Sequence, residues 1–179
     1  MYRLFAGLPV PEPVVQQLVS LSGGVPGARW QRPDQIHLTL RFIGDVDGGV
    51  FDDARYALAR VGGTTFDLQL NGVGHFGVGR RAHALWADVV GNPALMALQA
   101  RVESALVRAG LAPEPRKFKP HVTVARLKSP DMERLGSFLA HNALFRTEPF
   151  PIDAFHLYSS HLAHSGAIYR IEETYELSE

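Results

Sequence analysis

The sequence predicts a single two-lobed domain of the α+β class, spanning residues 1–179. Segments with strand alternation and segments with helical spacing do not follow one another in the regular strand–helix–strand order of a parallel sheet. The composition, 46% apolar and 20% charged, is ordinary for a globular chain that buries a core. A phrase of the form His-apolar-Thr-apolar occurs twice, at 37–40 and 121–124, about half the chain apart. This repeat indicates two related halves.

The first part of the chain predicts a strand, a helix and the strand that carries the first phrase. Residues 2–8 alternate sufficiently for a strand. Two prolines then favour a helix over 13–22, which the pair Gly23-Gly24 ends. A strand over 35–43 follows, and Gly44 is expected to end it.

The next elements surround a glycine-rich segment. Apolar residues at helical spacing predict a helix over 48–61. Alternation of apolar and polar residues over 66–71 indicates a half-buried strand. Residues 72–81 contain four glycines and two arginines and are expected to form a bend or loop, after which 82–90 predicts another strand.

The second phrase also lies between helical segments. Asn92 as a cap and Pro93 at the first position predict a helix that ends near residue 110. A connection rich in Pro, Lys and Arg, 112–120, leads into a strand over 121–126. The two phrases are therefore expected in similar surroundings, each on a strand with a predicted helix before it and another after it.

The last part of the chain predicts one helix and two strands. Pro130 favours the start of a helix that continues to about 141. Strands are expected over 150–160 and 167–177, joined by a turn at 164–166.

The repeated phrase places two kinds of polar side chain on one face of each strand. Side chains alternate along a strand, so a His and a Thr two residues apart point the same way, and the apolar residues point into a core. A single His in such a strand is commonly a structural residue at the edge of the core. Two copies facing each other would instead place two imidazoles and two hydroxyls around one cleft, which suits a phosphodiester.

The distribution of charge favours a small or terminal anionic ligand. Net charge is zero, which argues against a general nucleic-acid binder. The segment around the second phrase, however, has no acidic residue and five basic ones, namely Arg116, Lys117, Lys119, Arg126 and Lys128.

Several classes of function are excluded or disfavoured by what the sequence lacks. Without cysteine there can be no disulfide, thiolate nucleophile or cysteine zinc site, and a reducing cytoplasm fits. Four of the other histidines lack ligand spacing, and His161 and His164, three apart, would suit a metal only on a helix, whereas a strand end and turn are expected there. No phosphate loop or nucleophile elbow is present, so we expect neither a metal nor a cofactor. No apolar run is long enough to span a membrane, and the N-terminal apolar stretch is too short for a secretory signal.

The flanks of the two phrases resemble the two-histidine phosphoesterase superfamily, in particular the RNA 2′,3′-cyclic phosphodiesterases, also called 2′-5′ RNA ligases. The resemblance covers nearly the whole chain. It is carried by Arg3–Pro9, Trp30 with His37–Gly44, Phe118–Arg126, and Leu157–Ser160 with Gly166 and Tyr169.

This resemblance implies a bilobal fold of two antiparallel sheets, related by a pseudo-twofold axis around a central cleft, with helices on the outer faces. It also implies metal-independent hydrolysis of RNA 2′,3′-cyclic phosphate ends to 2′-phosphates, with reverse 2′-5′ joining in some members. By the same resemblance His121 is the base toward water and His37 the acid toward the leaving 3′ oxygen. Thr39 and Thr123 would bind the non-bridging phosphate oxygens.

Two arginines are further candidates for binding phosphate. Arg41 follows His37 by four residues, on the same face of a regular strand, although it could equally be a solvated charge. Arg126 follows His121 by five residues, on the opposite face unless the strand twists or ends, but the family pattern has Arg there. An aromatic ring at the rim could stack on the terminal base, and the candidates are Phe5, Phe42 and Phe118.

Other functions remain open at this point. The substrate could be ADP-ribose 1″,2″-cyclic phosphate or a 2′-5′ oligoadenylate, or the chain could be a non-catalytic module that binds RNA ends. The expected partners are RNA 3′ ends or nucleotides with a 2′,3′-cyclic phosphate, and we expect a monomer without membrane contact. A metal-dependent hydrolase fails because the ligands are missing.

Overall fold

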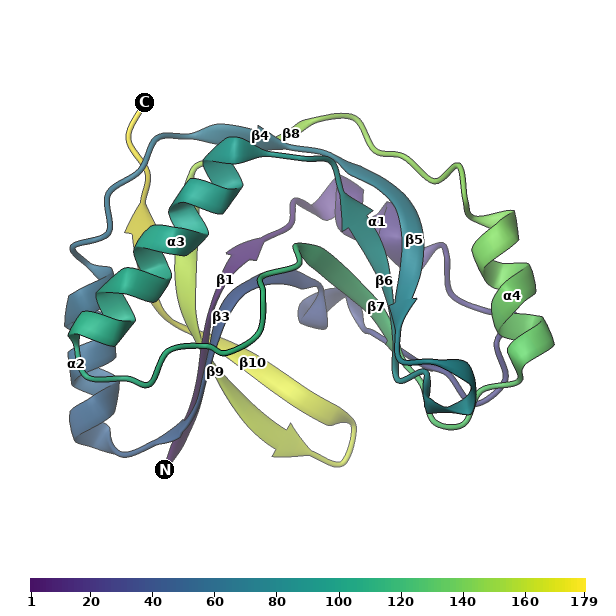
Figure 1. Ribbon diagram of the computed structural model, residues 1–179, viewed down its shortest axis with the longest axis horizontal. Helices are drawn as coiled ribbons and strands as arrows, with labels where there is room; N and C mark the ends of the chain where they lie inside the picture. The colour runs from purple at the N-terminus through teal and green to yellow at the C-terminus, as the bar shows by residue number, and fades with distance from the viewer.

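The computed structural model describes residues 1–179 as an antiparallel sheet with helices around it (Figure 1). The strands are β1 Tyr2–Pro9, β2 Arg29–Trp30, β3 His37–Val46, β4 Phe66–Leu68, β5 Leu70–Phe76, β6 Ala84–Val89, β7 His121–Arg126, β8 Phe150–Ile152, β9 Ala154–Ala163 and β10 Gly166–Glu176. The helices are α1 Glu12–Val19, α2 Gly48–Leu58, α3 Pro93–Arg108 and α4 Met132–His141, with 3₁₀ turns η1 at Pro33–Gln35 and η2 at Gly79–Arg81.

The large sheet consists of two halves that meet at the strands carrying the repeated phrase. Its order is β10-β9-β1-β3-β7-β6-β5, with β2 paired to β7. The halves join through one residue pair between the central strands, Leu38 and Val122. The order outward from this joint is equivalent on both sides, because β1 and β6 flank the centre and β9 and β5 follow. The α+β class and the antiparallel architecture predicted from the sequence are thus confirmed.

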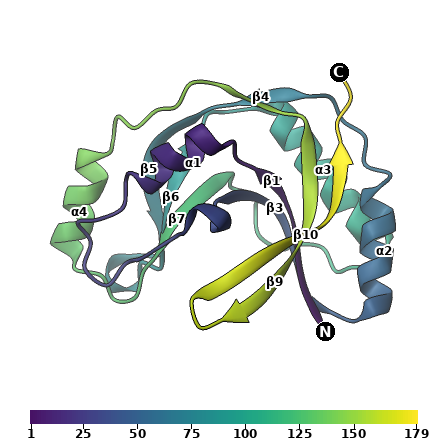
Figure 2. The ribbon, with the colours of Figure 1, turned by 180° about the vertical axis from the view of Figure 1, so that it is seen from behind.

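The two ends of the chain lie in the same half. Figure 1 shows α2 and α3 beside the half that contains both termini, whereas α4 lies at the opposite end of the molecule. From behind, Figure 2 shows that the β9–β10 hairpin projects away from α2 and α3. A two-stranded sheet of β4 and β8 completes the fold. None of the helices has both the length and the apolarity needed to cross a membrane.

Burial follows the alternation predicted for the motif strands. Leu38, Leu40, Val122 and Val124 are all at most 3% exposed and belong to the main hydrophobic core. Their burial orients the intervening His and Thr side chains away from the core. Burying an aliphatic side chain of this size contributes about 1.5–3 kcal/mol, so the core fixes the faces of both strands.

Several predicted boundaries were wrong, and glycine explains two of them. Gly44 does not end β3, because it adopts φ 96° within a strand that shifts register against β1 and continues. Residues 72–76 form part of β5 and not a loop. There Gly74 lies against the ring of Trp86, where a Cβ would come within 2.3 Å of a ring carbon. Glycine here permits close packing in a strand and does not signal a break.

The remaining differences concern the ends of elements. The first motif strand begins two residues later than expected because η1 precedes it, and α1 ends at Val19, before the expected limit of 22. The Asn92 cap of α3 is confirmed, since its side chain accepts a hydrogen bond from the Leu95 amide. The last expected strand pair comprises three strands, because β8 is separate from β9.

Candidate active site

The two motif strands place their polar side chains in one cleft of about 840 Å³. His37 and Thr39 of β3 line it from one half, and His121 and Thr123 of β7 from the other. The juxtaposition of two imidazoles and two hydroxyls, which the repeated phrase predicts, is therefore present in the structure.

Both imidazoles are held by the same kind of hydrogen bond. His37 Nδ1 lies 2.8 Å from the Gln35 carbonyl oxygen, and His121 Nδ1 lies 2.6 Å from the Lys119 carbonyl oxygen. A carbonyl oxygen only accepts hydrogen bonds, so each Nδ1 donates its hydrogen. In the neutral ring Nε2 is then the unprotonated nitrogen that can take up or return a proton.

The two motifs differ in what their Nε2 atoms contact. Thr39 Oγ1 lies 2.9 Å from His37 Nε2, so its hydroxyl donates to the neutral imidazole. Neither His121 Nε2 nor the Thr123 hydroxyl makes a hydrogen bond within the protein. These two polar groups of the second motif are thus free of protein partners.

Aromatic rings position each imidazole further. The ring of Phe5 lies 4.7 Å from that of His37, and Tyr169 approaches the same imidazole edge-on at 5.1 Å. In the other half, Phe76 contacts His121 edge-on at 4.8 Å. These contacts favour one ring orientation.

The surroundings of both histidines favour the neutral imidazole. Burial lowers the pKa of His37 to about 4, and the nearby charges of Arg126 and His121 lower it as well, against the effect of the Gln35 carbonyl. The pKa of His121 is also lowered, mainly by burial, with Arg126 and Lys119 acting in the same direction. A cleft that keeps both imidazoles neutral and retains a guanidinium between them is prepared for an anion.

A β-bulge at the same place in both motif strands determines which residue follows the motif into the cleft. Against β1, Gly7 pairs with Thr39 and Ala6 with Arg41, so Leu40 is the extra residue. In β7 the extra residue is Val124, because Trp86 pairs with Thr123 and Leu85 with Ala125. A bulge reverses the alternation beyond it. The next cleft-facing positions are therefore Phe42 and Arg126.

Because of the bulge, Arg126 lies in the cleft, as the family resemblance implied and as regular alternation did not. Arg126 lines the cleft, and its charge acts on both histidines. It has no ion-pair partner. Its guanidinium is therefore available to an anion.

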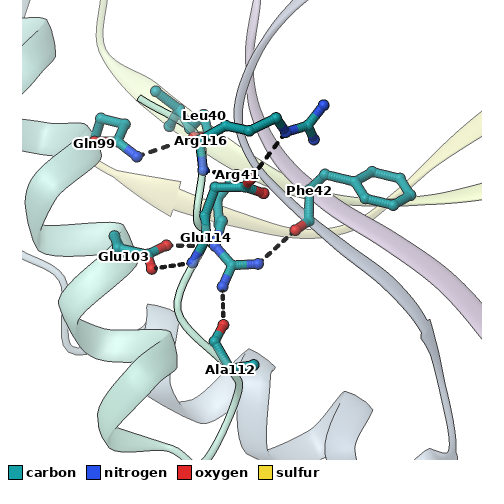
Figure 3. A network of polar contacts seen from close by, with 8 residues as sticks. All are labelled: Leu40, Arg41, Phe42, Gln99, Glu103, Ala112, Glu114 and Arg116. Atoms are coloured by element: carbon teal, nitrogen blue, oxygen red, sulfur yellow. Dashed lines mark hydrogen bonds and ion pairs between the residues drawn. The ribbon is translucent and has the colours of Figure 1, made fainter. Parts of the chain in front are cut away.

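The same bulge turns Arg41 away from the cleft, which corrects the expectation based on its spacing from His37. Arg41 is only 6% exposed, and its guanidinium forms an ion pair with Glu103 of α3. It also donates to the carbonyl oxygens of Phe42 and Ala112. Figure 3 shows these bonds together with the one that Glu103 accepts from the Glu114 amide. Arg41 thus anchors the connection that leads into β7.

The three candidate aromatic rings lie in different environments. Phe42 is 40% exposed at the cleft, with the Arg3 guanidinium 5.0 Å from its ring centre. Phe5 also lines the cleft but is only 4% exposed, because it packs beneath His37. Phe118 packs against the core and lines a neighbouring groove. Of the three, only Phe42 exposes its ring at the cleft itself, where it could stack on a base.

Sequence reasoning missed several residues that line the cleft, among them Tyr169, Phe76 and Arg29. Tyr169 lies on the β10 strand and Phe76 at the end of β5, where a loop was expected. Arg29 of β2 pairs with Arg126 across the sheet and has no ion-pair partner. Phe76 pairs with Ala84 of β6, and the glycines around it obscured its strand in the sequence.

No three His, Asp or Glu side chains gather where they could hold a metal ion. His161 contacts Ser159 on the β9 strand, and Ser159 donates to Glu172. The expectation of chemistry without a metal stays a prediction.

Comparison with known proteins gives a consistent result. The model of the 2′-5′ RNA ligase superfamily matches residues 11–163. A protein of Thermotoga maritima named RNA 2′,3′-cyclic phosphodiesterase is 32% identical over 148 residues, covering 81% of this chain and 77% of its own. One of the same name from Aeropyrum pernix is 31% identical over 139 residues, covering 76% of this chain and 79% of its own.

Solved structures share the fold. E. coli LigT in its apo form superposes with a TM-score of 0.80 at 22% identity, covering 99% of this chain and 98% of that one. The structure of E. coli LigT complexed with 3′-AMP gives a TM-score of 0.78 at 22% identity, covering 99% of both chains. At this identity the similarity concerns the fold alone.

Proposed function

Because the chain belongs to the 2′-5′ RNA ligase superfamily, we propose that it hydrolyses 2′,3′-cyclic phosphate ends of RNA to 2′-phosphates without a metal ion. One observation carries this proposal: two imidazoles, each held through Nδ1, line one cleft with two hydroxyls and an unpaired arginine. The names of the relatives agree, since they are RNA 2′,3′-cyclic phosphodiesterases.

The reaction requires one proton acceptor and one proton donor. His121 Nε2 takes a proton from water as the water oxygen bonds to phosphorus. The bond from phosphorus to the 3′ oxygen breaks, and that oxygen takes its proton from His37 Nε2, leaving the phosphate on the 2′ oxygen. Each proton transfer typically accelerates a reaction by about 10²–10⁴.

The hydroxyls and the arginine stabilise the charge that develops on the phosphate. Thr39 and Thr123 donate to its non-bridging oxygens, which carry more negative charge in the transition state. In this complex Thr39 exchanges its bond to His37 for one to the phosphate. The Arg126 guanidinium, free of protein partners, binds the same anion.

The acid role requires that His37 be protonated in the complex with substrate, although the protein's own surroundings lower its pKa to about 4. A cyclic phosphate brings a negative charge beside the ring and offsets the charge of Arg126. An adjacent opposite charge raises the pKa of a histidine. The base role of His121 needs no such change, because burial already favours its neutral form.

The substrate is the terminal nucleotide of an RNA. Phe42, exposed at the rim beside Arg3, provides a stacking surface for its base. Arg29 and Arg126 provide positive charge along the cleft. With a 5′-hydroxyl in place of water, the same two histidines would join RNA ends through a 2′-5′ bond.

Product analysis tests the proposal. The protein is incubated in EDTA with an oligonucleotide ending in a 2′,3′-cyclic phosphate, and the products are separated from synthetic 2′- and 3′-phosphate standards. We expect the 2′-phosphate alone, at an undiminished rate. A 3′-phosphate product, or loss of turnover on chelation, would contradict the scheme. Faster turnover of ADP-ribose 1″,2″-cyclic phosphate would assign a different substrate, and binding without turnover would indicate a non-catalytic module.

A further inference from the structure

We propose that a second groove beside the cleft binds the nucleotide that carries the 5′-hydroxyl when 2′-5′ bonds are made or cleaved. The groove has a volume of about 480 Å³ and opens into the cleft, with which it shares Thr39, Phe42, Phe76, His83, Arg116 and His121. The inference rests on the proposed function, because it assigns a second subsite to the same reaction.

The position of the groove relative to the two histidines indicates which reactant it serves. His121 lines the groove, whereas His37 and Thr123 line only the cleft. In a displacement at phosphorus the attacking and leaving oxygens lie roughly in line on opposite sides. With His121 as the base, the attacking hydroxyl is on the side where the groove opens.

Aromatic rings at the junction fit a nucleobase. The Phe76 ring contacts His121 edge-on at 4.8 Å, and its face lies toward His83, with 6.2 Å between the ring centres and 26° between the planes. His83 is exposed, and Phe118 lines the groove farther from the cleft. Stacking on such side chains is tolerant of sequence, which suits a site for the end of an RNA.

Positive charge along the groove fits the phosphates that follow the first nucleotide. Lys117 is exposed and has no ion-pair partner, and the Arg116 side chain is 83% exposed although it pairs with the Glu114 carboxylate at 3.0 Å. The Lys119 ammonium, in contrast, is held 3.3 Å from an Asp88 carboxylate oxygen and lies over the Trp86 ring. Water as the attacking group needs neither a stacking surface nor a phosphate contact. The groove therefore implies a second RNA segment.

The step balances without a further reactant. In joining, the 5′ oxygen bonds to phosphorus and gives its proton to His121, while the bond to the 3′ oxygen breaks and His37 protonates that oxygen. In cleavage the 3′-hydroxyl attacks, gives its proton to His37, and the 5′ oxygen leaves with a proton from His121. A cyclic phosphate and a 5′-hydroxyl result.

Cleavage of a defined RNA tests the groove. The substrate contains one 2′-5′ linkage followed by two further nucleotides, and its cleavage rate is divided by the rate of hydrolysis of the matching cyclic-ended fragment. His83→Ala and Lys117→Gln should each lower this ratio, His83→Ala by about 5- to 150-fold, the usual range for loss of one stacking contact. Lys128→Gln and His141→Ala, exposed residues that line neither the cleft nor the groove, are the matched controls and should leave the ratio unchanged.

The possible outcomes separate this inference from the proposed function. If the wild-type protein hydrolyses cyclic ends but does not cleave the 2′-5′ linkage, or if the variants leave the ratio unchanged, the groove is not this subsite. If Lys117→Gln instead slows hydrolysis of a cyclic-ended oligonucleotide relative to a cyclic mononucleotide, the groove binds the preceding part of the same RNA. If the wild-type protein hydrolyses no cyclic end, the proposed function itself is wrong.

Discussion

Each motif histidine is fixed through the nitrogen that faces away from the cleft, by a carbonyl two residues earlier in the chain. The bond determines the tautomer, and edge-on or tilted aromatic rings restrict the ring plane. A repeated phrase can indicate that two imidazoles matter, but it gives no information about these backbone partners. The tautomer could therefore be assigned only from the fold.

The threonines should matter less than the histidines, because each provides one hydrogen bond to a charged group and no proton transfer. Such a bond contributes about 1.5–3 kcal/mol, so Thr39→Val and Thr123→Val should lower kcat/KM by about 10- to 150-fold. Thr39→Ser keeps the hydroxyl and should retain most of the activity. Steady-state kinetics on a cyclic-ended oligonucleotide check this. Equal loss in the serine and valine variants would show that the hydroxyl is not the relevant group.

At the scale of the element, the bulge after each motif threonine is the feature that spacing alone could not predict. A regular strand would place Arg41 in the cleft and Arg126 on the other face. With one extra residue at Leu40 and at Val124, the structure has the reverse. The sequence contains no Gly or Pro at either bulge. Only the pairing partners on β1 and β6 reveal it.

Substitution of the two arginines should separate stability from activity. Arg41→Met leaves the carboxylate of Glu103 partly buried without its cation and should lower the free energy of unfolding by roughly 3 kcal/mol. Arg126→Met removes an unpaired guanidinium and should change that free energy by only about 0.5 kcal/mol, while it lowers kcat/KM at least tenfold by loss of a charge-assisted bond to phosphate. Urea unfolding and steady-state kinetics on both variants provide the measurements. An Arg41→Met variant that is stable but inactive would show that Arg41 acts in the active site and not in stabilising the fold.

At the scale of the whole molecule, the fold is more symmetric than the site it forms. The α+β class, most elements and the meeting of the two motifs followed from hydrophobic periodicity and the repeat. Phe76, Tyr169 and Arg29 did not, because their place in the cleft depends on how their hairpins or strands pair with distant ones, β9 with β1 and both β2 and β6 with β7. Equivalent positions after the bulge hold Phe42 in one half and Arg126 in the other. One half thus offers an aromatic surface and the other a charge.

Stability should depend on pH through the histidines whose pKa is lowered in the folded chain, namely His37, His121 and His156. The pKa of His37 is about 4 in the folded chain and near 6.5 when unfolded, so between these values the unfolded chain binds a proton that the folded chain does not. The free energy of unfolding therefore falls as the pH drops through this window. At about 1.36 kcal/mol per pKa unit, the loss due to His37 is on the order of 3 kcal/mol. Below the window this loss does not grow further. His121 acts in the same direction.

Urea unfolding of the wild-type protein and His37→Asn between pH 7.5 and 4 measures this contribution. The variant should lose less stability over the window, whereas His141→Asn, an exposed control, should follow the wild type. Parallel curves for the wild type and His37→Asn would show that His37 titrates normally.

The assignment of His121 as the base and His37 as the acid can be tested with a leaving group that needs no acid. A cyclic phosphate whose 3′ oxygen is replaced by sulfur expels a thiolate, and a thiol has a pKa of about 8.5, far below that of a sugar hydroxyl. On the oxygen substrate, His37→Ala and His121→Ala should each lose about 10²–10⁴ in rate. On the sulfur substrate His37→Ala should approach the wild-type rate, and His121→Ala should remain slow. Rescue of His121→Ala instead would reverse the two roles, and rescue of neither would contradict acid–base catalysis by this pair.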